Sequence, residues 1–258
     1  TPLYSSAASD VYKRQEIRAY ADAMLDTVKR WVPITYEAFL DYRVGGTEVS
    51  LKGKKIIVIE AEGFCPYCEK FNANVVNNYD GDIPVFYRFA HQLEGLEIDS
   101  PTWATPTILF LENGKEVFAH QGYLNPKEFY QALGYFKLGD SEAYRVAFEK
   151  GTDARFCKEY EIFKDTPDGI FVDKLSGAPL FDTKDRFNSS TGWLSFTRPI
   201  EGSVYSKPDN SYGMRRTEIR SVTSDIHLGH VFSDGPNGMP RYCINATVLE
   251  FKQRSSET

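Results

Sequence analysis

Cysteine is scarce in this sequence, because the 258 residues contain only Cys65, Cys68, Cys157 and Cys243. Four cysteines are too few to build a disulfide scaffold for a chain of this length. Redox or nucleophilic use of these thiols is therefore the better interpretation. The sequence also lacks a run of about eighteen apolar residues, which excludes a transmembrane helix in the given chain.

An excess of positive charge is also missing. The formal net charge is −6, whereas a protein that binds mainly nucleic acid needs a basic face for the phosphates. Hydrophobic residues make up 41% of the chain and aromatic residues 14%, which is enough to form ordinary cores. The length favours two domains, and no internal repeat or low-complexity tract is present.

The first fifteen residues have no usable periodicity and resemble translated adapter sequence more than natural protein, so we exclude residues 1–15 from fold reasoning. A signal peptide would be lost together with a missing natural start. From Glu16 to Val32 apolar residues recur at helical spacing, and Pro33 ends this pattern. A second short helix is expected over residues 36–42.

A CxxC sequence, Cys65-Pro66-Tyr67-Cys68, follows the apolar run Ile56–Ile59, which predicts a buried strand. Placed between a strand and a helix, the first sulfur lies near the helix N-terminus, where free N–H groups stabilise a thiolate. The second sulfur is one turn further, within disulfide reach. The alternative, half of a zinc site, lacks a second pair of ligands in this half of the chain.

The segment after the CxxC predicts two further strands, a hairpin and a helix. Strands are expected at 85–89 and 107–111, an Asn113-Gly114 turn leads into residues 116–119, and Asn125-Pro126 opens the last helix. Together with Thr105-Pro106-Thr107, this order resembles the thioredoxin family over about residues 33–136. The resemblance implies that Cys65 is the exposed attacking thiol, Cys68 the resolving thiol, and Pro106 a cis proline beside them.

The pair Pro66-Tyr67 departs from the thioredoxin pattern, because it is the dipeptide of glutaredoxins, and this leaves the preferred redox partner open. We expect a thioredoxin-like domain with an N-terminal helix over residues 16–140 and a linker helix over 141–150. From residue 151 to 258 the sequence changes to short strands, glycines and turns, which predicts a mainly antiparallel β domain. The fold class is thus an α/β thioredoxin-like sandwich followed by a mainly antiparallel β domain.

Two histidines and a cysteine fall within the segments 227–232 and 241–245, which read HLGHVF and RYCIN. A thiol needs a nearby proton donor or acceptor to work as a nucleophile, and imidazole suits this task near neutral pH. Alternating apolar residues from 241 to 251 predict that Cys243 lies on a strand. The alternatives are a buried structural cysteine with two unrelated histidines, and a metal pair formed by His227 and His230.

Separated motifs in this half, at 176–181, 192–196, 227–232, 234–236 and 241–245, resemble the peptide-methionine-R-sulfoxide reductase (MsrB) family in order and spacing. The resemblance implies that Cys243 attacks the sulfoxide sulfur and becomes a sulfenic acid, with His230 as the acid. It implies that His227 and Asn245 bind the substrate and a water molecule and keep the acid, His230, in position. Trp193, Arg241 and Phe232 would bind substrate, with the Trp193 ring facing the methyl group; the alternative for Trp193 is a plain core residue.

Three departures from the family pattern affect the prediction. The four positions that carry a structural zinc in many members are Asp173, Ser176, Ser221 and Ser224 here, so zinc is not expected. Leu194 replaces the proline that normally follows the tryptophan.

The third departure concerns recycling. Thr191 replaces the usual resolving cysteine, so either Cys157 resolves the sulfenic acid or an external thiol reduces it directly. Cys157 is expected on a short helix. The alternative to a resolving role is that Cys157 is only a small buried hydrophobic residue.

The sequence thus predicts a repair enzyme that reduces R-methionine sulfoxide in proteins, with the fused thioredoxin-like domain as electron donor and no cofactor beyond dithiols. Its expected partners are oxidised methionine-containing proteins and an upstream thiol reductase, and we expect a monomer that does not bind nucleic acid. The main alternative is a thiol–disulfide oxidoreductase whose C-terminal domain recruits protein substrates. Fusions of this kind resemble bacterial envelope repair proteins, which suggests the bacterial envelope as the location of this protein. The cytoplasm is the alternative location.

Overall fold

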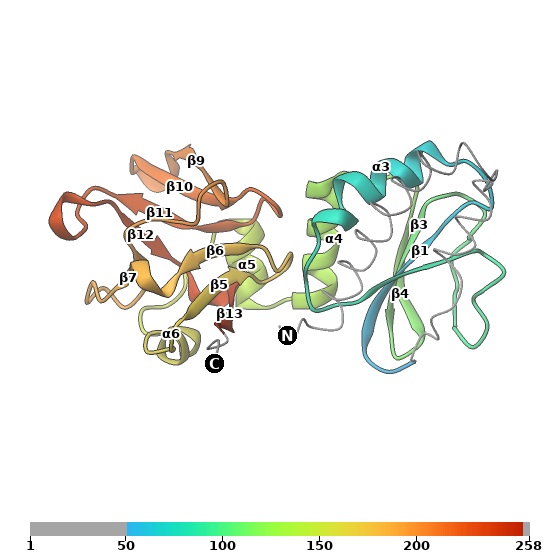
Figure 1. Ribbon diagram of the computed structural model, residues 1–258, viewed down its shortest axis with the longest axis horizontal. Coiled ribbons are helices and arrows are strands. Elements are labelled where there is room, and N and C mark those ends of the chain that lie inside the picture. Colours follow the sequence, from blue (N-terminus) through green and yellow to red (C-terminus); the bar gives the residue numbers. More distant parts are fainter. Residues whose placement is uncertain (1–50, 255–258) are drawn as a thin grey trace, which may run out of the picture. The chain divides into compact units, whose positions relative to one another are not determined.

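The computed structural model describes residues 51–254, and its contacts divide the chain into two units with a boundary between Asn125 and Pro126 (Figure 1). The expected leader at 1–15 and the expected helices at 16–32 and 36–42 lie outside the described residues. No helix among residues 51–254 is long and apolar enough to cross a membrane.

The first unit contains a four-stranded sheet in the order β2-β1-β3-β4, in which only β1 and β2 run parallel. The apolar run after Lys55 forms the inner strand β1, which pairs with β2 on one side and β3 on the other. Ile56, Ile57, Val58 and Ile59 are fully buried, so both faces of this strand are covered. The described elements of this unit are β1 Lys54–Ile59, α3 Pro66–Asn74, η1 Val76–Asn78, β2 Val85–Arg88, β3 Thr107–Glu112 and β4 Lys115–Gln121.

Local sequence explains the turns that hold the first unit in register. Asn113 and Gly114 both adopt positive φ, 54° and 82°, which is the conformation of a tight hairpin turn between β3 and β4. Cys65 is the N-cap of α3, and Pro66 occupies the first helical position, where its missing N–H costs nothing. The strand, CxxC and helix predicted from the sequence are confirmed.

The second unit contains two antiparallel sheets, one of six strands in the order β7-β8-β12-β11-β10-β9 and one of three in the order β13-β5-β6. Its helices are α4 Pro126–Leu138, α5 Glu142–Glu149 and α6 Lys158–Phe163. Its strands are β5 Gly169–Asp173, β6 Pro179–Asp182, β7 Arg186–Phe187, β8 Leu194–Phe196, β9 Val204–Asp209, β10 Arg216–Ser221, β11 His227–Phe232, β12 Arg241–Ile244 and β13 Leu249–Gln253, with 3₁₀ turns η2 Thr183–Asp185, η3 Ser211–Gly213, η4 Pro236–Gly238 and η5 Ala246–Val248. The mainly antiparallel β domain is confirmed.

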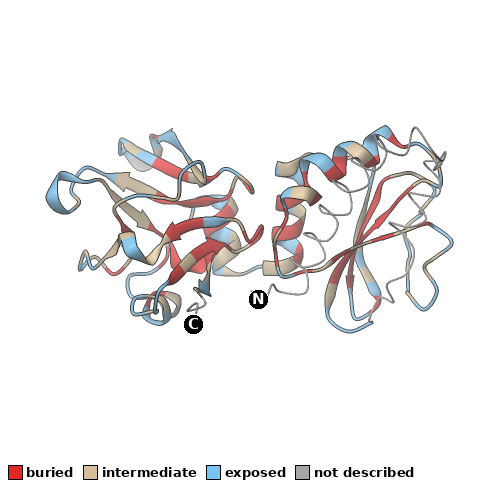
Figure 2. Cartoon of the chain, viewed as in Figure 1, coloured by how far each residue is buried: buried red, intermediate tan, exposed pale blue. Residues whose placement is uncertain are grey.

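Buried aromatic rings join the two sheets of the second unit. Phe196 on β8 stacks on Phe181 on β6 with ring centroids 4.6 Å apart, and it meets Phe171 on β5 edge-on at 5.5 Å. All three side chains are fully buried, and Figure 2 shows buried residues running along these strands. The six-stranded sheet is therefore backed by a close-packed core that holds it rigid.

Three sequence-based expectations differ from the structure. Residues 241–251 do not form one strand: the turn Ala246–Val248 separates β12 from β13, which belong to different sheets. Cys157 is not inside a helix but caps the N-terminus of α6. The expected linker helix, α5, belongs by its contacts to the second unit, where Val146 and Ala147 are buried, and the same contacts place α4 there too.

Candidate active site

A row of side chains crosses the six-stranded sheet at the position of Cys243. In the register of the strands, Glu218 on β10 lies opposite His230 on β11, His230 lies opposite Cys243 on β12, and Cys243 lies opposite Ser195 on β8. Residues directly opposite in antiparallel strands have their Cβ atoms about 5 Å apart on the same face. The structure thus brings the predicted cysteine and histidine together on a rigid element.

An extra residue in β11 places both histidines on this face. The register steps from Ile219–Gly229 to Arg220–His227, so Leu228 is a bulge residue, and two histidines three positions apart point the same way. Their ring centroids are 5.3 Å apart. Gly229 is required here, because a Cβ atom would lie 2.0 Å from the carbonyl oxygen of Cys243.

His230 is held by a carboxylate that sequence analysis did not identify. Its Nε2 lies 2.8 Å from Oδ2 of Asp209, which also accepts a hydrogen bond of 2.8 Å from Arg216. Hydrogen bonds from Ser211 and His230, together with the charge of Arg216, hold the pKa of Asp209 well below its usual value despite burial. Burial lowers the pKa of His230, and the Asp209 carboxylate acts in the opposite direction.

His227 has a carboxylate partner of its own. Its Nδ1 lies 2.9 Å from Oε1 of Glu218, and both side chains are almost completely buried. Burial opposes ionisation of Glu218, but hydrogen bonds from His227 and Arg220 lower its pKa to about 2. The second oxygen of Glu218 lies 3.6 Å from Nζ of Lys150, the residue that ends α5. The Nε2 atom of His227 is buried and has no hydrogen-bond partner within the described chain.

Cys243 is a free, partly buried thiol next to a fixed cation. Burial raises its pKa, while the charge and hydrogen bond of Arg241, two residues away on the same face, lower it. Arg241 donates two hydrogen bonds of 2.8 and 2.9 Å to Asp234, and its guanidinium lies 4.6 Å from the ring centroid of Phe232. Arg241 is therefore placed to stabilise the thiolate of Cys243. This role would be additional to the substrate binding that the resemblance implies for Arg241.

Trp193 and Asn245 are linked through the backbone of Asp153. The indole N–H donates to the carbonyl oxygen of Asp153 at 2.9 Å, and the N–H of Asp153 donates to Oδ1 of Asn245 at 2.9 Å. Nδ2 of Asn245 donates to the carbonyl oxygen of Leu228 at 3.1 Å. The side chain of Asn245 thus positions two parts of the site: the bulge at Leu228 in β11, and the backbone of Asp153, which binds the indole ring of Trp193.

Cys157 lies close to the turn that precedes Trp193. The N–H of its neighbour Phe156 donates to the carbonyl oxygen of Gly192 at 2.9 Å, and Gly192 follows Thr191, the position of the usual resolving cysteine. The Cys157 sulfur accepts from the N–H of Tyr160 at 3.4 Å. Burial, with the nearby charge of Asp153, raises the pKa of this thiol.

The four positions that hold zinc in many MsrB proteins form a hydrogen-bonded cluster instead. Ser224 donates to Oδ2 of Asp173 at 2.5 Å, the N–H of Ser176 donates to Oδ1 of Asp173 at 3.1 Å, and the N–H of Ser224 donates to Oγ of Ser221 at 3.3 Å. One carboxylate and three hydroxyls do not match the thiolate set of a structural zinc site. Residues 51–254 contain no other group of three or more His, Cys, Asp or Glu side chains suited to a metal.

We expect Ser224→Ala to lower the free energy of unfolding of the second unit by about 1–3 kcal/mol, because it leaves a buried carboxylate oxygen of Asp173 without its donor. Urea titration followed by circular dichroism measures the change. Ser206→Ala on β9, where the serine is exposed, is the control and should change stability little. Equal stability of the two variants would contradict a structural role for the cluster.

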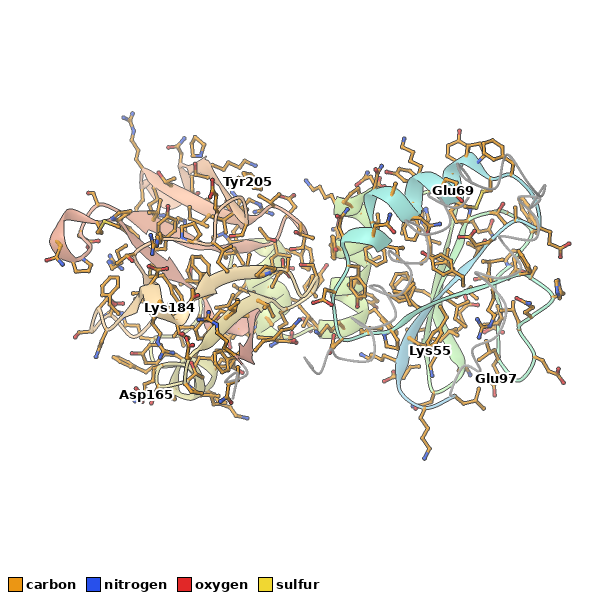
Figure 3. The ribbon with its side chains drawn as sticks, viewed as in Figure 1. Lys55, Glu69, Glu97, Asp165, Lys184 and Tyr205 are labelled. Atoms are coloured by element: carbon orange, nitrogen blue, oxygen red, sulfur yellow. A yellow bond between two sulfur atoms is a disulfide. The ribbon has the colours of Figure 1, made fainter. Side chains whose placement is uncertain are left out.

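The first unit carries its own redox site. Cys65 and Cys68 form a disulfide, drawn in yellow in Figure 3, and the Cys65 sulfur accepts from the N–H of Cys68 at 3.1 Å. The Thr105–Pro106 bond is cis, and the Cys65 sulfur lies 3.7 Å from the Thr105 carbonyl oxygen. Cys65 is 7% exposed and Cys68 1%, so Cys65 is the more accessible sulfur, although the attacking thiol was expected to be exposed.

Two known domain families match the chain. A SelR domain matches residues 140–253, and a thioredoxin-like domain matches residues 47–137. The boundary between the matches follows α4, whereas the contacts within the structure place α4 in the second unit. The SelR match contains the row from Glu218 to Ser195, and the thioredoxin-like match contains the CxxC.

Proposed function

Residues 140–253 are a peptide-methionine-R-sulfoxide reductase domain of the SelR (MsrB) family joined to a thioredoxin-like domain, and we propose that Cys243 is its nucleophile. The Cys243 thiolate attacks the sulfoxide sulfur, the S–O bond breaks, and the oxygen ends on the cysteine as a sulfenic acid while methionine leaves. The observation that carries this proposal is the pairing of Cys243 with His230 across β11 and β12.

In this proposal, His230 supplies the proton that the sulfoxide oxygen needs in order to leave. A charged imidazole carries protons on both nitrogens, and the one on Nε2 is directed at Asp209, so Nδ1–H is the donor to the substrate. Arg241 favours the thiolate, and His227, oriented by Glu218, contacts the oxygen or a water. The Trp193 ring, fixed by its bond to Asp153, faces the methyl group of the substrate.

We further propose that Cys157 resolves the sulfenic acid. Its thiol displaces water from the oxidised Cys243 and forms a Cys157–Cys243 disulfide, for which the position of Cys157 beside the 191–193 turn is the support. After one turnover with sulfoxide and no reductant, mass spectrometry of the digested protein should find this disulfide in most chains. A persistent sulfenic acid in wild type, identical to that in Cys157→Ser, would mean direct reduction by an external thiol.

The thioredoxin-like domain is the proposed electron donor. Reduced Cys65 attacks the disulfide, Cys68 completes the exchange, and the Cys65–Cys68 disulfide passes to an upstream thiol reductase. Fusion raises the effective concentration of this donor to the millimolar range. We expect Cys65→Ser to stop multiple turnover with a disulfide reductase as electron supply but to leave the first turnover intact. Unchanged multiple turnover would show that the two domains work independently.

We also propose that structural zinc has no part in this protein, because Asp173 and three serines satisfy one another where thiolates would bind the metal. The test of the function as a whole is turnover of the separate R and S epimers of a methionine-sulfoxide peptide by the reduced full chain. Reduction of the R epimer alone supports the proposal. Reduction of protein disulfides without sulfoxide turnover would favour a thiol–disulfide oxidoreductase.

A further inference from the structure

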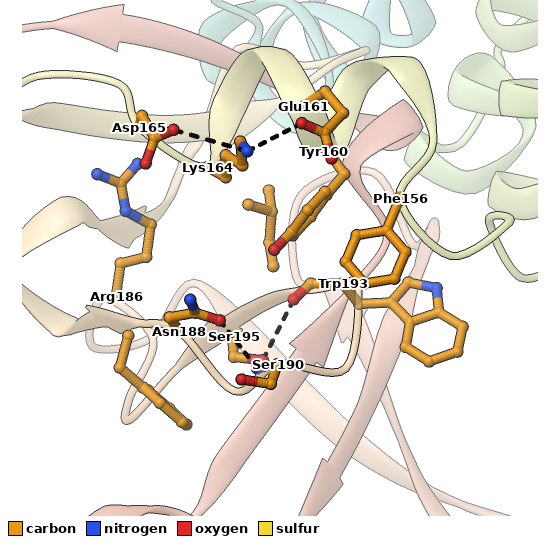
Figure 4. Close-up of a pocket in the computed structure, with 12 residues that line it drawn as sticks. Phe156, Tyr160, Glu161, Lys164, Asp165, Arg186, Asn188, Ser190, Trp193 and Ser195 are labelled. Atoms are coloured by element: carbon orange, nitrogen blue, oxygen red, sulfur yellow. Dashed lines mark hydrogen bonds and ion pairs between the residues drawn. The ribbon is translucent and has the colours of Figure 1, made fainter.

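A cleft of about 440 Å³ opens beside Trp193 in the second unit (Figure 4). It lies between α6 with its preceding residues and the segment 186–195. Its volume is within the range of sites that bind small ligands or single side chains. The reaction described above does not use this cleft beyond the tryptophan itself.

One wall of the cleft is aromatic, and Phe156 is its exposed member. Figure 4 shows Phe156, Tyr160 and Trp193 on the same side. Phe156 is 54% exposed, although its ring meets Tyr160 edge-on with centroids 5.6 Å apart. An exposed aromatic ring held in place by a neighbouring ring offers a rigid surface to an apolar or aromatic side chain.

The charged groups around the cleft are two cations, Lys164 and Arg186, and two carboxylates, Glu161 and Asp165. Lys164 forms ion pairs with Glu161 at 2.9 Å and with Asp165 at 3.9 Å. The guanidinium of Arg186 donates to Thr166 and to the carbonyl oxygen of Phe163. Since the carboxylates of Glu161 and Asp165 balance the charges of Lys164 and Arg186, the cleft carries no net charge that would select a charged ligand.

Hydrogen-bonding groups that suit a peptide backbone also face the cleft. In Figure 4 the hydroxyl of Tyr160 points into it, and Asn188 and Ser190 lie on the opposite side. Oδ1 of Asn188 accepts from the N–H of Ser190 at 2.8 Å, which leaves the amide N–H₂ group of Asn188 as a donor. Such donors match the carbonyl oxygens of an extended peptide.

Two residues, Ser195 and Trp193, connect the cleft with the proposed reaction site. Ser195 lines it and lies directly opposite Cys243 in the sheet, and Trp193 belongs to both. Consecutive residues of an extended peptide are about 3.3 Å apart. A substrate whose sulfoxide is at Cys243 and whose methyl group is on the Trp193 ring therefore has its neighbouring residue at the mouth of this cleft.

We propose that the cleft binds the residue next to the methionine sulfoxide in a protein substrate and prefers an aromatic or large aliphatic side chain there. This inference rests on the proposed function of Cys243 and names its preferred substrate class.

The test compares R-sulfoxide peptides of the forms acetyl-Gly-X-Met(O)-Gly-amide and acetyl-Gly-Met(O)-X-Gly-amide, with X as Gly, Leu, Phe or Asp. In one of the two series, kcat/KM should be about tenfold higher for Phe than for Gly, the gain of burying about half an aromatic side chain. The difference should lie in KM, Leu should fall between, and Asp should equal Gly. kcat/KM for the sulfoxide does not include the later recycling of Cys243, so Cys157 does not enter the comparison.

Phe156→Ala should reduce the Phe-over-Gly preference to within about twofold, because it removes the accessible half of the aromatic wall. Ile162→Ala is the matched control, since Ile162 is 57% exposed on α6, the helix that follows Phe156, but does not line the cleft, and it should retain the preference. Equal kcat/KM for all X in both series, or an unchanged preference in Phe156→Ala, would overturn the inference. Absence of turnover of N-acetyl-methionine-R-sulfoxide amide by wild type would instead refute the proposed function.

Discussion

Cys243→Ser is expected to abolish reduction of methionine-R-sulfoxide, with turnover reduced by at least about 10⁴-fold, in the range of other nucleophile deletions. The proposed reaction moves oxygen onto the Cys243 sulfur, and a serine hydroxyl cannot accept it. No other cysteine of the second unit lies in the row with His230. Chromatographic measurement of methionine released from the R-sulfoxide peptide in a single turnover tests this expectation.

Cys157→Ser is the matched control for this experiment. It should release one equivalent of methionine per chain at the wild-type rate and then stop when only the disulfide reductase is supplied. The two variants remove one sulfur each from the same domain, so a difference between them separates attack from recycling. A full first turnover in Cys243→Ser would assign the attack to another group.

Local sequence signals were sufficient for most of the fold. The fully buried run Ile56–Ile59, the Asn113-Gly114 turn and the Cys65 N-cap each have a local physical cause, and each is where it was expected. The exception is residues 241–251, where alternating apolar residues predicted one strand. Asn245 ends β12 there because its side chain and N–H both bind the carbonyl of Leu228, a contact far away in sequence.

The site was predicted in part. The sequence singled out His227, His230 and Cys243, which the structure brings together on one face of the sheet, but not the carboxylates that orient the histidines. Asp209 and Glu218 lie on β9 and β10, and they reach the histidines only through strand register and the Leu228 bulge, which local sequence does not determine. Glu218 does not stand out in the sequence of β10, which reads RTEIRS and is mostly polar, so local sequence offered no signal for its role.

Asp209→Asn is expected to lower activity at pH 8 by roughly 10²-fold. A positioned general acid contributes a factor of about 10²–10⁴ to the rate, and the substitution removes most of the protonated form of the proposed acid, His230. In the proposed mechanism, His230 acts as the acid only while it is protonated. Burial, Arg216 and His227 lower the pKa of His230, and Asp209 raises it. Without the carboxylate the pKa falls further, so the fall of kcat/KM on the alkaline side should move to lower pH.

The shape of the pH profile distinguishes this positioning role from a structural one. Asparagine retains an oxygen that can accept the hydrogen bonds of Ser211, so the local turn should persist. Asp209→Glu should restore part of the alkaline limb, whereas Glu201→Gln, an equal loss of charge at an exposed residue, should leave the profile unchanged. A uniform loss of activity at all pH values in Asp209→Asn would mean that the carboxylate serves folding and not the protonation of His230.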